Sequence, residues 1–165
     1  MKNLKKDNKG FTIIEVLIVL AIAGLIMLVV FLAVPALQRN ARNTSKRSDV
    51  SKALGAVGES TANNNGKIPV TADLASLTTA ANLSSATTLN ALIPTTVATI
   101  VAPSTSEVEI VTGVVCNATA SNITGATLTA ANYQSIVTAG SNRAVVALYS
   151  VEAAGGAQVT QCQGS

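Results

Sequence analysis

The sequence contains neither histidine nor tryptophan, and aromatic residues make up only 2% of it. Without histidine the chain lacks the most frequent metal ligand and general base of proteins. Its two cysteines lie far apart and form no C-x-x-C redox motif, and no phosphate-binding loop or nucleophile elbow is present. These absences predict a protein that is not an enzyme and that holds no metal and no cofactor.

The scarcity of aromatic residues also limits the stability and the binding partners that we expect of the C-terminal part. Beyond residue 37 the only aromatic residues are Tyr133 and Tyr149. Because large aromatic side chains usually strengthen a core, we expect a marginally stable head that gains from covalent or quaternary support. The head also has few basic residues, Lys67 and Arg143 beyond residue 52, so composition argues against nucleic acid as a partner.

What the sequence does contain is a long apolar run. Residues 16–37 carry no charge, and Glu15 stands directly before them. A helix that rises ~1.5 Å per residue crosses a hydrocarbon core of about 30 Å over this length. A carboxylate inside an apolar helix is costly, so we expect Glu15 to have a functional partner. The alternative is a carboxylate at the membrane boundary that reaches water.

A basic leader, MKNLKKDNKG, precedes this run, and it ends at the junction between Gly10 and Phe11. The order of basic leader, Gly-Phe junction, Glu15 and apolar helix resembles the class III signal peptide of type IV pilins and pseudopilins. The resemblance implies that a prepilin peptidase cleaves after Gly10 and methylates the new amino group of Phe11. It also implies that the helix is retained and that subunit assembly uses Phe11, Thr12 and Glu15, with the Glu15 carboxylate against the Phe11 amino group of a neighbouring subunit.

The same resemblance, together with the local patterns, predicts an α+β pilin fold in which a long N-terminal helix packs on a small antiparallel β-sheet head. Residues 1–10 are a cleaved leader, and 11–37 are the transmembrane and polymerisation helix. Residues 38–62 continue this helix in amphipathic form. Residues 63–106 form a variable region like the αβ-loop of pilins, and 107–165 form the sheet head with a C-terminal disulfide loop.

Periodicity supports one helix from residue 12 to about residue 62. Its second half carries an apolar stripe at helical spacing, formed by Val50, Ala53, Leu54 and Val57. Gly24 and Pro35 interrupt the first half. Gly24 stands where the family usually has a glycine, whereas Pro35 lies three residues beyond the common spacing. The helix therefore either bends or partly melts there during assembly, or carries an ordinary kink.

The remaining elements are shorter. We expect a short helix at residues 72–77 and a strand at 97–101. Alternating or β-branched runs predict strands at 107–116, 144–151 and 157–162. The last two are expected to form a hairpin across Gly155 and Gly156, within an antiparallel sheet of three or four strands.

Cys116 and Cys162 lie in the outer half of the chain and fit an exported domain with one disulfide. The resemblance points the same way, since the family often has such a C-terminal bridge. The alternative is two free thiols in a reducing compartment.

Basic residues gather directly after the apolar run, at Arg39, Arg42, Lys46 and Arg47. They have four interpretations: contact with lipid head groups, pairing with acidic residues of adjacent subunits, nucleic-acid binding, or a solvated helix face. The acidic pair Glu107 and Glu109 shares one face of a predicted strand, where we expect both to be solvated.

Taken as a whole, the sequence predicts a structural subunit of a type IV pilus-like filament for adhesion, motility or DNA uptake. It would pass once through the cytoplasmic membrane with its N-terminus inside and then enter a cell-surface filament. Its expected partners are copies of itself in a helical homopolymer, the prepilin peptidase, a membrane platform protein, an assembly ATPase, and the lipid bilayer before assembly. The alternatives are a pseudopilin of a type II secretion or competence apparatus, and a single-pass envelope protein that does not polymerise.

Overall fold

A computed structural model of the chain describes residues 10–84, 87–94, 103, 104, 106–117, 122–124 and 136–164. Contacts within the chain separate two units, residues 1–40 and 41–165. Helix α1, Ile13–Asn63, begins in the first unit and ends in the second. Most of the expected leader, residues 1–9, and the expected strand at 97–101 lie outside the described residues.

The first unit is helical from Ile13 onward, and its large apolar side chains are exposed. Its helix contains an 18-residue window of mean hydropathy 3.3, of which no part is buried. Among the described residues, α1 is the one helix long and apolar enough to cross a membrane. Together with the apolar run after the leader, this fits membrane insertion.

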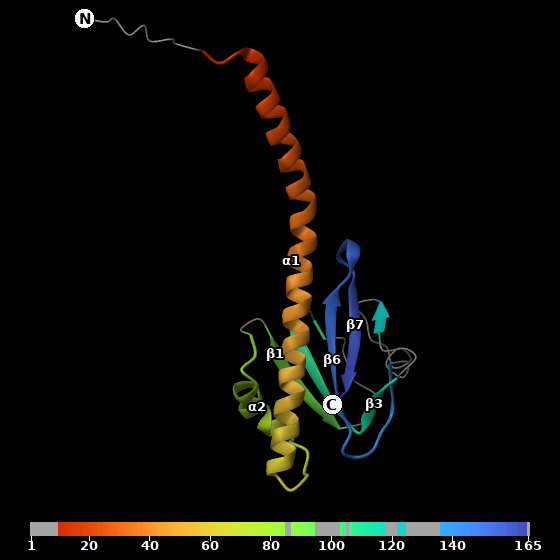
Figure 1. Cartoon of the computed structure of the whole chain (residues 1–165). Coiled ribbons are helices and arrows are strands. Elements are labelled where there is room, and N and C mark those ends of the chain that lie inside the picture. Colours follow the sequence, from red (N-terminus) through yellow and green to blue (C-terminus); the bar gives the residue numbers. More distant parts are fainter. Residues whose placement is uncertain are drawn as a thin grey trace, which may run out of the picture. The chain divides into compact units, whose positions relative to one another are not determined.

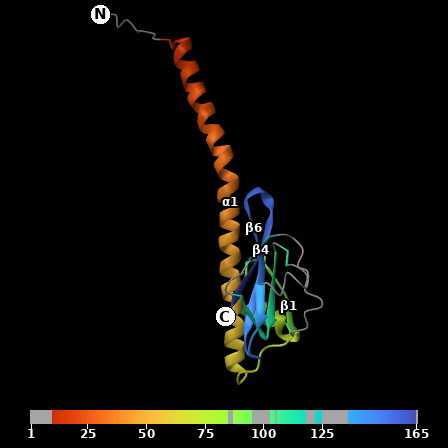
Figure 2. The ribbon, with the colours of Figure 1, turned by 90° about the vertical axis from the view of Figure 1, so that its right-hand side faces the viewer.

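The second unit combines the C-terminal part of α1 with a β-sheet, and the two lie side by side in both views (Figures 1 and 2). A short 3₁₀ turn, Thr71–Asp73, and helix α2, Leu74–Ala81, follow α1. The strands are β1 Thr88–Pro94, β2 Glu107–Thr112, β3 Val114–Cys116, β4 Asn122–Thr124, β5 Val137–Ala139, β6 Val145–Glu152 and β7 Gln158–Gly164. A second 3₁₀ turn, Ala154–Gly156, joins β6 to β7.

Five of the strands form one sheet in the order β1-β2-β6-β7-β4, and β3 pairs with β5 in a separate small sheet. The pairs β2–β6, β6–β7 and β4–β7 are antiparallel, whereas β1 and β2 are parallel. The fold is therefore α+β, with a long helix and a sheet head that is mostly antiparallel. The β6–β7 hairpin across the glycine pair is confirmed.

The core between α1 and the sheet uses the predicted apolar stripe. Val50 and Ala53 are fully buried, and Leu54 and Val57 are nearly so. They pack with Val108 and Ile110 of β2, and with further apolar residues of α2, β1 and β6. Burial of each Val or Leu side chain contributes about 1.5–3 kcal/mol. A second cluster lies on the other side of β2 and β6, formed by Val111, Val114, Ile136, Val137, Val146 and Leu148.

Two predictions about the sheet were wrong. The expected strand at 107–116 is broken at Gly113, whose φ of 79° turns the chain, so β2 and β3 join different sheets. The sheet is also neither purely antiparallel nor limited to four strands, because β1 adds a parallel edge to β2. A parallel partner needs a crossover, and nothing in local periodicity reveals one. The short helix occurs somewhat later than expected, at Leu74–Ala81.

Candidate functional site

Thr12 and Glu15 close the start of α1. The backbone N–H and the hydroxyl of Thr12 both donate to Oε2 of Glu15, at 2.9 and 2.7 Å. In a capping box, the side chain of a glutamate three residues after an N-cap threonine accepts a hydrogen bond from the backbone N–H of that threonine. The T-x-x-E spacing was present in the sequence as a helix start signal, and it explains why α1 begins at Ile13. Within the single chain, Thr12 is therefore the partner of the Glu15 carboxylate.

The junction before this cap is accessible. Phe11 is 89% exposed, and no heavy atom lies within 4 Å of a side chain built at Gly10. From Ile13 onward the large apolar side chains of the first unit are exposed as well. A contiguous apolar surface of this extent indicates contact with a membrane or with other chains.

Gly24 and Pro35 both lie inside α1, which runs through both positions as one helix. Gly24 has open space around it and Pro35 is exposed. Their proposed role in loosening the helix stays a prediction.

Cys116 and Cys162 form a disulfide that links β3 to β7. Both are half-buried and pack against the second apolar cluster. The bridge therefore ties the small β3–β5 sheet to the five-stranded sheet, and it leaves no free cysteine in the chain.

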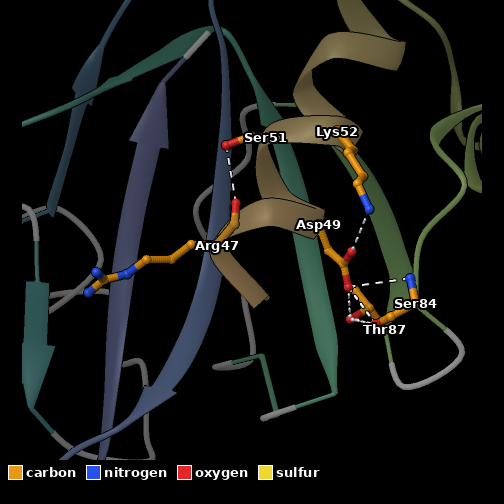
Figure 3. A network of polar contacts seen from close by, with 6 residues as sticks. All are labelled: Arg47, Asp49, Ser51, Lys52, Ser84 and Thr87. Carbon is orange, nitrogen blue, oxygen red and sulfur yellow. Dashed lines mark hydrogen bonds and ion pairs between the residues drawn. The ribbon is translucent and has the colours of Figure 1, made fainter. Parts of the chain in front are cut away.

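A polar network lies beside the apolar stripe, between α1 and the segment before β1 (Figure 3). Asp49 is 2% exposed, and its Oδ2 accepts hydrogen bonds from the hydroxyls of Ser84, at 2.5 Å, and Thr87, at 2.8 Å. Its Oδ1 lies 3.5 Å from Nζ of Lys52. Burial alone would raise the pKa of Asp49, but these hydrogen bonds and the Lys52 charge outweigh it and hold the pKa below its usual value.

One member of the basic cluster after the apolar run, Arg42, is held in contacts within the head. Arg42 donates from Nε and Nη2 to the two carboxylate oxygens of Glu152, at 2.9 and 2.7 Å. Asn43 exchanges hydrogen bonds with the backbone of Glu152, at 2.8 and 2.9 Å. These contacts attach α1 to the end of β6. The interpretation of a solvated helix face does not hold for Lys46, which is only 6% exposed.

Sequence reasoning missed the burial of Lys46 and Asp49, although a signal existed. Both positions extend the apolar stripe at helical spacing, since Lys46, Asp49, Val50, Ala53 and Leu54 fall on one helix face. Charged residues at stripe positions are therefore expected to be buried, unless the stripe ends before them.

The expectation that Glu109 is solvated was wrong. Glu109 is 8% exposed and lies opposite Leu148 of β6, on the side of the sheet that faces the second apolar cluster. Its Oε2 has no hydrogen-bond partner within the described part of the chain. Burial, with a smaller contribution from the charge of Glu107, raises the pKa of Glu109 to about 7. The alternation of the sequence placed Glu109 on one face of the strand, but it did not show that other residues bury this face.

Among the described residues there is no group of three or more His, Cys, Asp or Glu side chains that could hold a metal ion. The polar network around Asp49 is satisfied by hydroxyls and an ammonium, which are not metal ligands of choice.

Residues 5–31 match the family model of the prokaryotic N-terminal methylation motif. The match covers the end of the leader, the Gly10–Phe11 junction, the Thr12–Glu15 cap and the first part of the apolar helix. No curated protein and no solved structure matches the chain.

Proposed function

Because the chain carries the class III signal peptide of type IV pilins and pseudopilins, we propose that it is a structural subunit of a type IV pilus-like filament. The observation that carries the proposal is the accessible Gly10–Phe11 junction, followed by a capped Glu15 at the start of an exposed apolar helix. Cleavage after Gly10 would leave Phe11 as a new N-terminus whose amino group is positively charged.

The mechanism is an exchange of partners by Glu15. In the single chain, Thr12 satisfies one carboxylate oxygen, Oε2, through two hydrogen bonds. The charge remains without a cationic partner among these contacts. In a bundle of apolar helices, the Phe11 amino group of a neighbouring subunit would supply that partner, and the low dielectric would strengthen the attraction. Such an ion pair sets the axial register between subunits, while packing of the apolar helices supplies the association.

The proposed role is structural and includes no catalytic step. The chain would be inserted with its N-terminus in the cytoplasm, be processed by a prepilin peptidase and enter the filament through a platform protein and an assembly ATPase. The contact between successive subunits is heterologous and does not close, which produces a fibre instead of a ring.

Glu15→Gln tests this mechanism, because it keeps the size of the side chain and removes its charge. We expect cleavage at Gly10 to continue while the amount of subunit in surface-sheared filaments falls about tenfold or more, since one partner of a buried ion pair is lost. Glu59→Gln is the matched control, because Glu59 is an exposed carboxylate on the same helix. Quantitative mass spectrometry of the N-terminal peptide in the sheared and membrane fractions measures both processing and assembly.

The same peptide separates the alternatives. A peptide that begins at Phe11 in long surface fibres supports a pilin. Cleavage at Gly10 with no surface fibres, or with fibres only when the subunit is overproduced, supports a pseudopilin. An intact leader confined to the membrane fraction would overturn the proposal and leave a single-pass envelope protein.

A further inference from the structure

A cavity of about 250 Å³ lies within the second unit, where α1 meets the segment before β1, the residue preceding β2 and the end of β6. Its wall includes Arg42, Ser45 and Lys46 of α1, Ser84, Thr87 and Ser106. The cavity is smaller than typical pockets for organic ligands, which hold roughly 300–1,000 Å³. It has room for a group of a few heavy atoms.

Lys46 is the unsatisfied member of this wall. Its side chain is only 6% exposed, and its Nζ has no hydrogen-bond partner among the residues that the structure describes. An ammonium group has three N–H donors, and leaving them unpaired away from water is unfavourable. Burial accordingly lowers the pKa of Lys46, against the opposing charges of Asp49 and Glu107. The cavity therefore lacks an acceptor for this group.

The neighbouring cations are already in contact with carboxylates. Arg42 makes a two-pronged contact with Glu152, and Lys52 contacts Asp49. The hydroxyls of Ser84 and Thr87 donate to Asp49 as well. Donors that remain at the wall include the ammonium of Lys46, the hydroxyl of Ser45 and the guanidinium N–H groups that Arg42 does not use toward Glu152. These donors call for an oxygen ligand of negative charge.

We propose that this cavity binds a phosphate group with a single negative charge, and that Lys46 is its charge partner. A phosphate presents several acceptor oxygens to one ammonium and to nearby hydroxyls, and lysine is a frequent phosphate ligand in proteins. A single negative charge gives the Lys46 ammonium a direct acceptor, whereas the carboxylates of Asp49, Glu107 and Glu152, which already offset the nearby cations, oppose a second negative charge. The proposal concerns the head and does not depend on polymerisation.

Two sources supply such a group: a phospholipid head group and a soluble phosphate. The cavity begins at Arg42, five residues after the apolar run ends at residue 37. Head groups occupy the layer directly outside the hydrocarbon core, so they are available to residues that closely follow a membrane-spanning run. The experiment below separates the two sources.

The full chain in phosphate-free detergent micelles is titrated near pH 6 with inorganic phosphate, and separately with a short-chain phosphatidylglycerol. The neutral short-chain diacylglycerol is the control for insertion of acyl chains. Backbone amide shifts of Ser45, Lys46 and Ser84 are followed by NMR. We expect saturable shifts at these amides with the phosphate-bearing probes and none with the diacylglycerol. Shifts with the lipid alone assign the site to a head group, and shifts with both assign it to the phosphate itself.

Lys46→Met and Lys52→Met form the matched pair, because both remove an ammonium from the same helix but only Lys46 lines the cavity. We expect affinity to fall about tenfold or more in Lys46→Met, as a charged hydrogen-bond donor is lost, and to change little in Lys52→Met. Absence of saturable shifts in the unmodified chain with either probe overturns the proposal, and so does equal affinity in a folded Lys46→Met variant.

Discussion

At the scale of single residues, three charged side chains are buried in the described part of the head, and they differ in whether they have hydrogen-bond partners. Asp49 has hydroxyl donors and a nearby ammonium, so its charge is stabilised where it lies. Lys46 and Glu109 each have a buried polar atom without a hydrogen-bond partner in the described part of the chain. An unpartnered buried charge lowers stability, and such groups often persist for reasons other than stability.

Glu109 makes the stability of the head dependent on pH. Its pKa is about 7 in the folded chain, against 4.5 for an exposed glutamate. The folded state therefore binds more protons than the unfolded state between these two values, and stability falls as the pH rises from about 4.5 through 7. The loss reaches up to about 3 kcal/mol above pH 7, at about 1.4 kcal/mol for each unit of pKa difference.

We expect Glu109→Gln to remove this dependence and to raise stability above pH 7, because the amide stays neutral. Amide hydrogen exchange of β2 and β6 peptides, corrected for intrinsic rates between pH 5 and 8, measures the change. Glu59→Gln, at an exposed site, should keep the original pH profile. An unaltered profile in Glu109→Gln would contradict the assignment.

At the scale of elements, the end of α1 depends on backbone geometry. Asn65 and Gly66 have φ angles of 54° and 80°, and the Gly66 N–H donates to the carbonyl of Thr61 at 2.8 Å. This reversal ends the helix as glycine does after many helices. The guanidinium of Arg143, from the segment between β5 and β6, packs against Gly66 where a side chain would stand. The turn therefore also joins the helix end to the sheet.

Gly66→Ala tests this turn. We expect a loss of about 1 kcal/mol or more, because alanine is strained at positive φ and its methyl group displaces Arg143. Gly58→Ala is the control, since Gly58 lies inside α1 with open space around it, and alanine there should be neutral or stabilising. Thermal unfolding in micelles, followed by circular dichroism, compares the two. Equal melting temperatures for both variants would contradict the role of the turn.

At the scale of the whole molecule, a disulfide crosslinks the head, whereas the N-terminal unit exposes its large apolar side chains. The Cys116–Cys162 bridge joins the two sheets across a sequence separation of 46 residues. The large apolar side chains of the first unit are exposed. The stability of the head and the exposed apolar surface of the helix thus depend on separate parts of the sequence.

Removing the bridge should destabilise the head. We expect the double variant Cys116→Ser with Cys162→Ser to lose about 4 kcal/mol, from the entropy that the loop gains when unfolded. The measurement is protease sensitivity of the head, together with the amount of assembled subunit. Reduction of the unmodified chain should reproduce the effect, while reduction of the double variant should do nothing further. A double variant as resistant as the parent would show that the two apolar clusters suffice.

Local patterns in the sequence determined the elements whose cause is local. The leader, the Gly10–Phe11 junction and the apolar run are adjacent in the chain, and the family model matches this stretch. The stripe from Val50 to Val57 follows helical spacing, and the β6–β7 hairpin needs only two runs and a glycine pair. Each of these features depends on residues close together in sequence. The family resemblance predicted the leader and its junction, while periodicity and turn chemistry predicted the stripe and the hairpin.

Strand pairing, burial and the cavity depend on segments that are distant in sequence, so only the tertiary structure decided them. The parallel pairing of β1 with β2 and the separation of β3 at Gly113 follow from contacts across the sheet, which local alternation does not encode. Burial of Lys46, Asp49 and Glu109 was decided in the same way, because a side chain is buried by what covers it. The cavity beside Lys46 exists only where α1, the segment before β1 and the end of β6 meet.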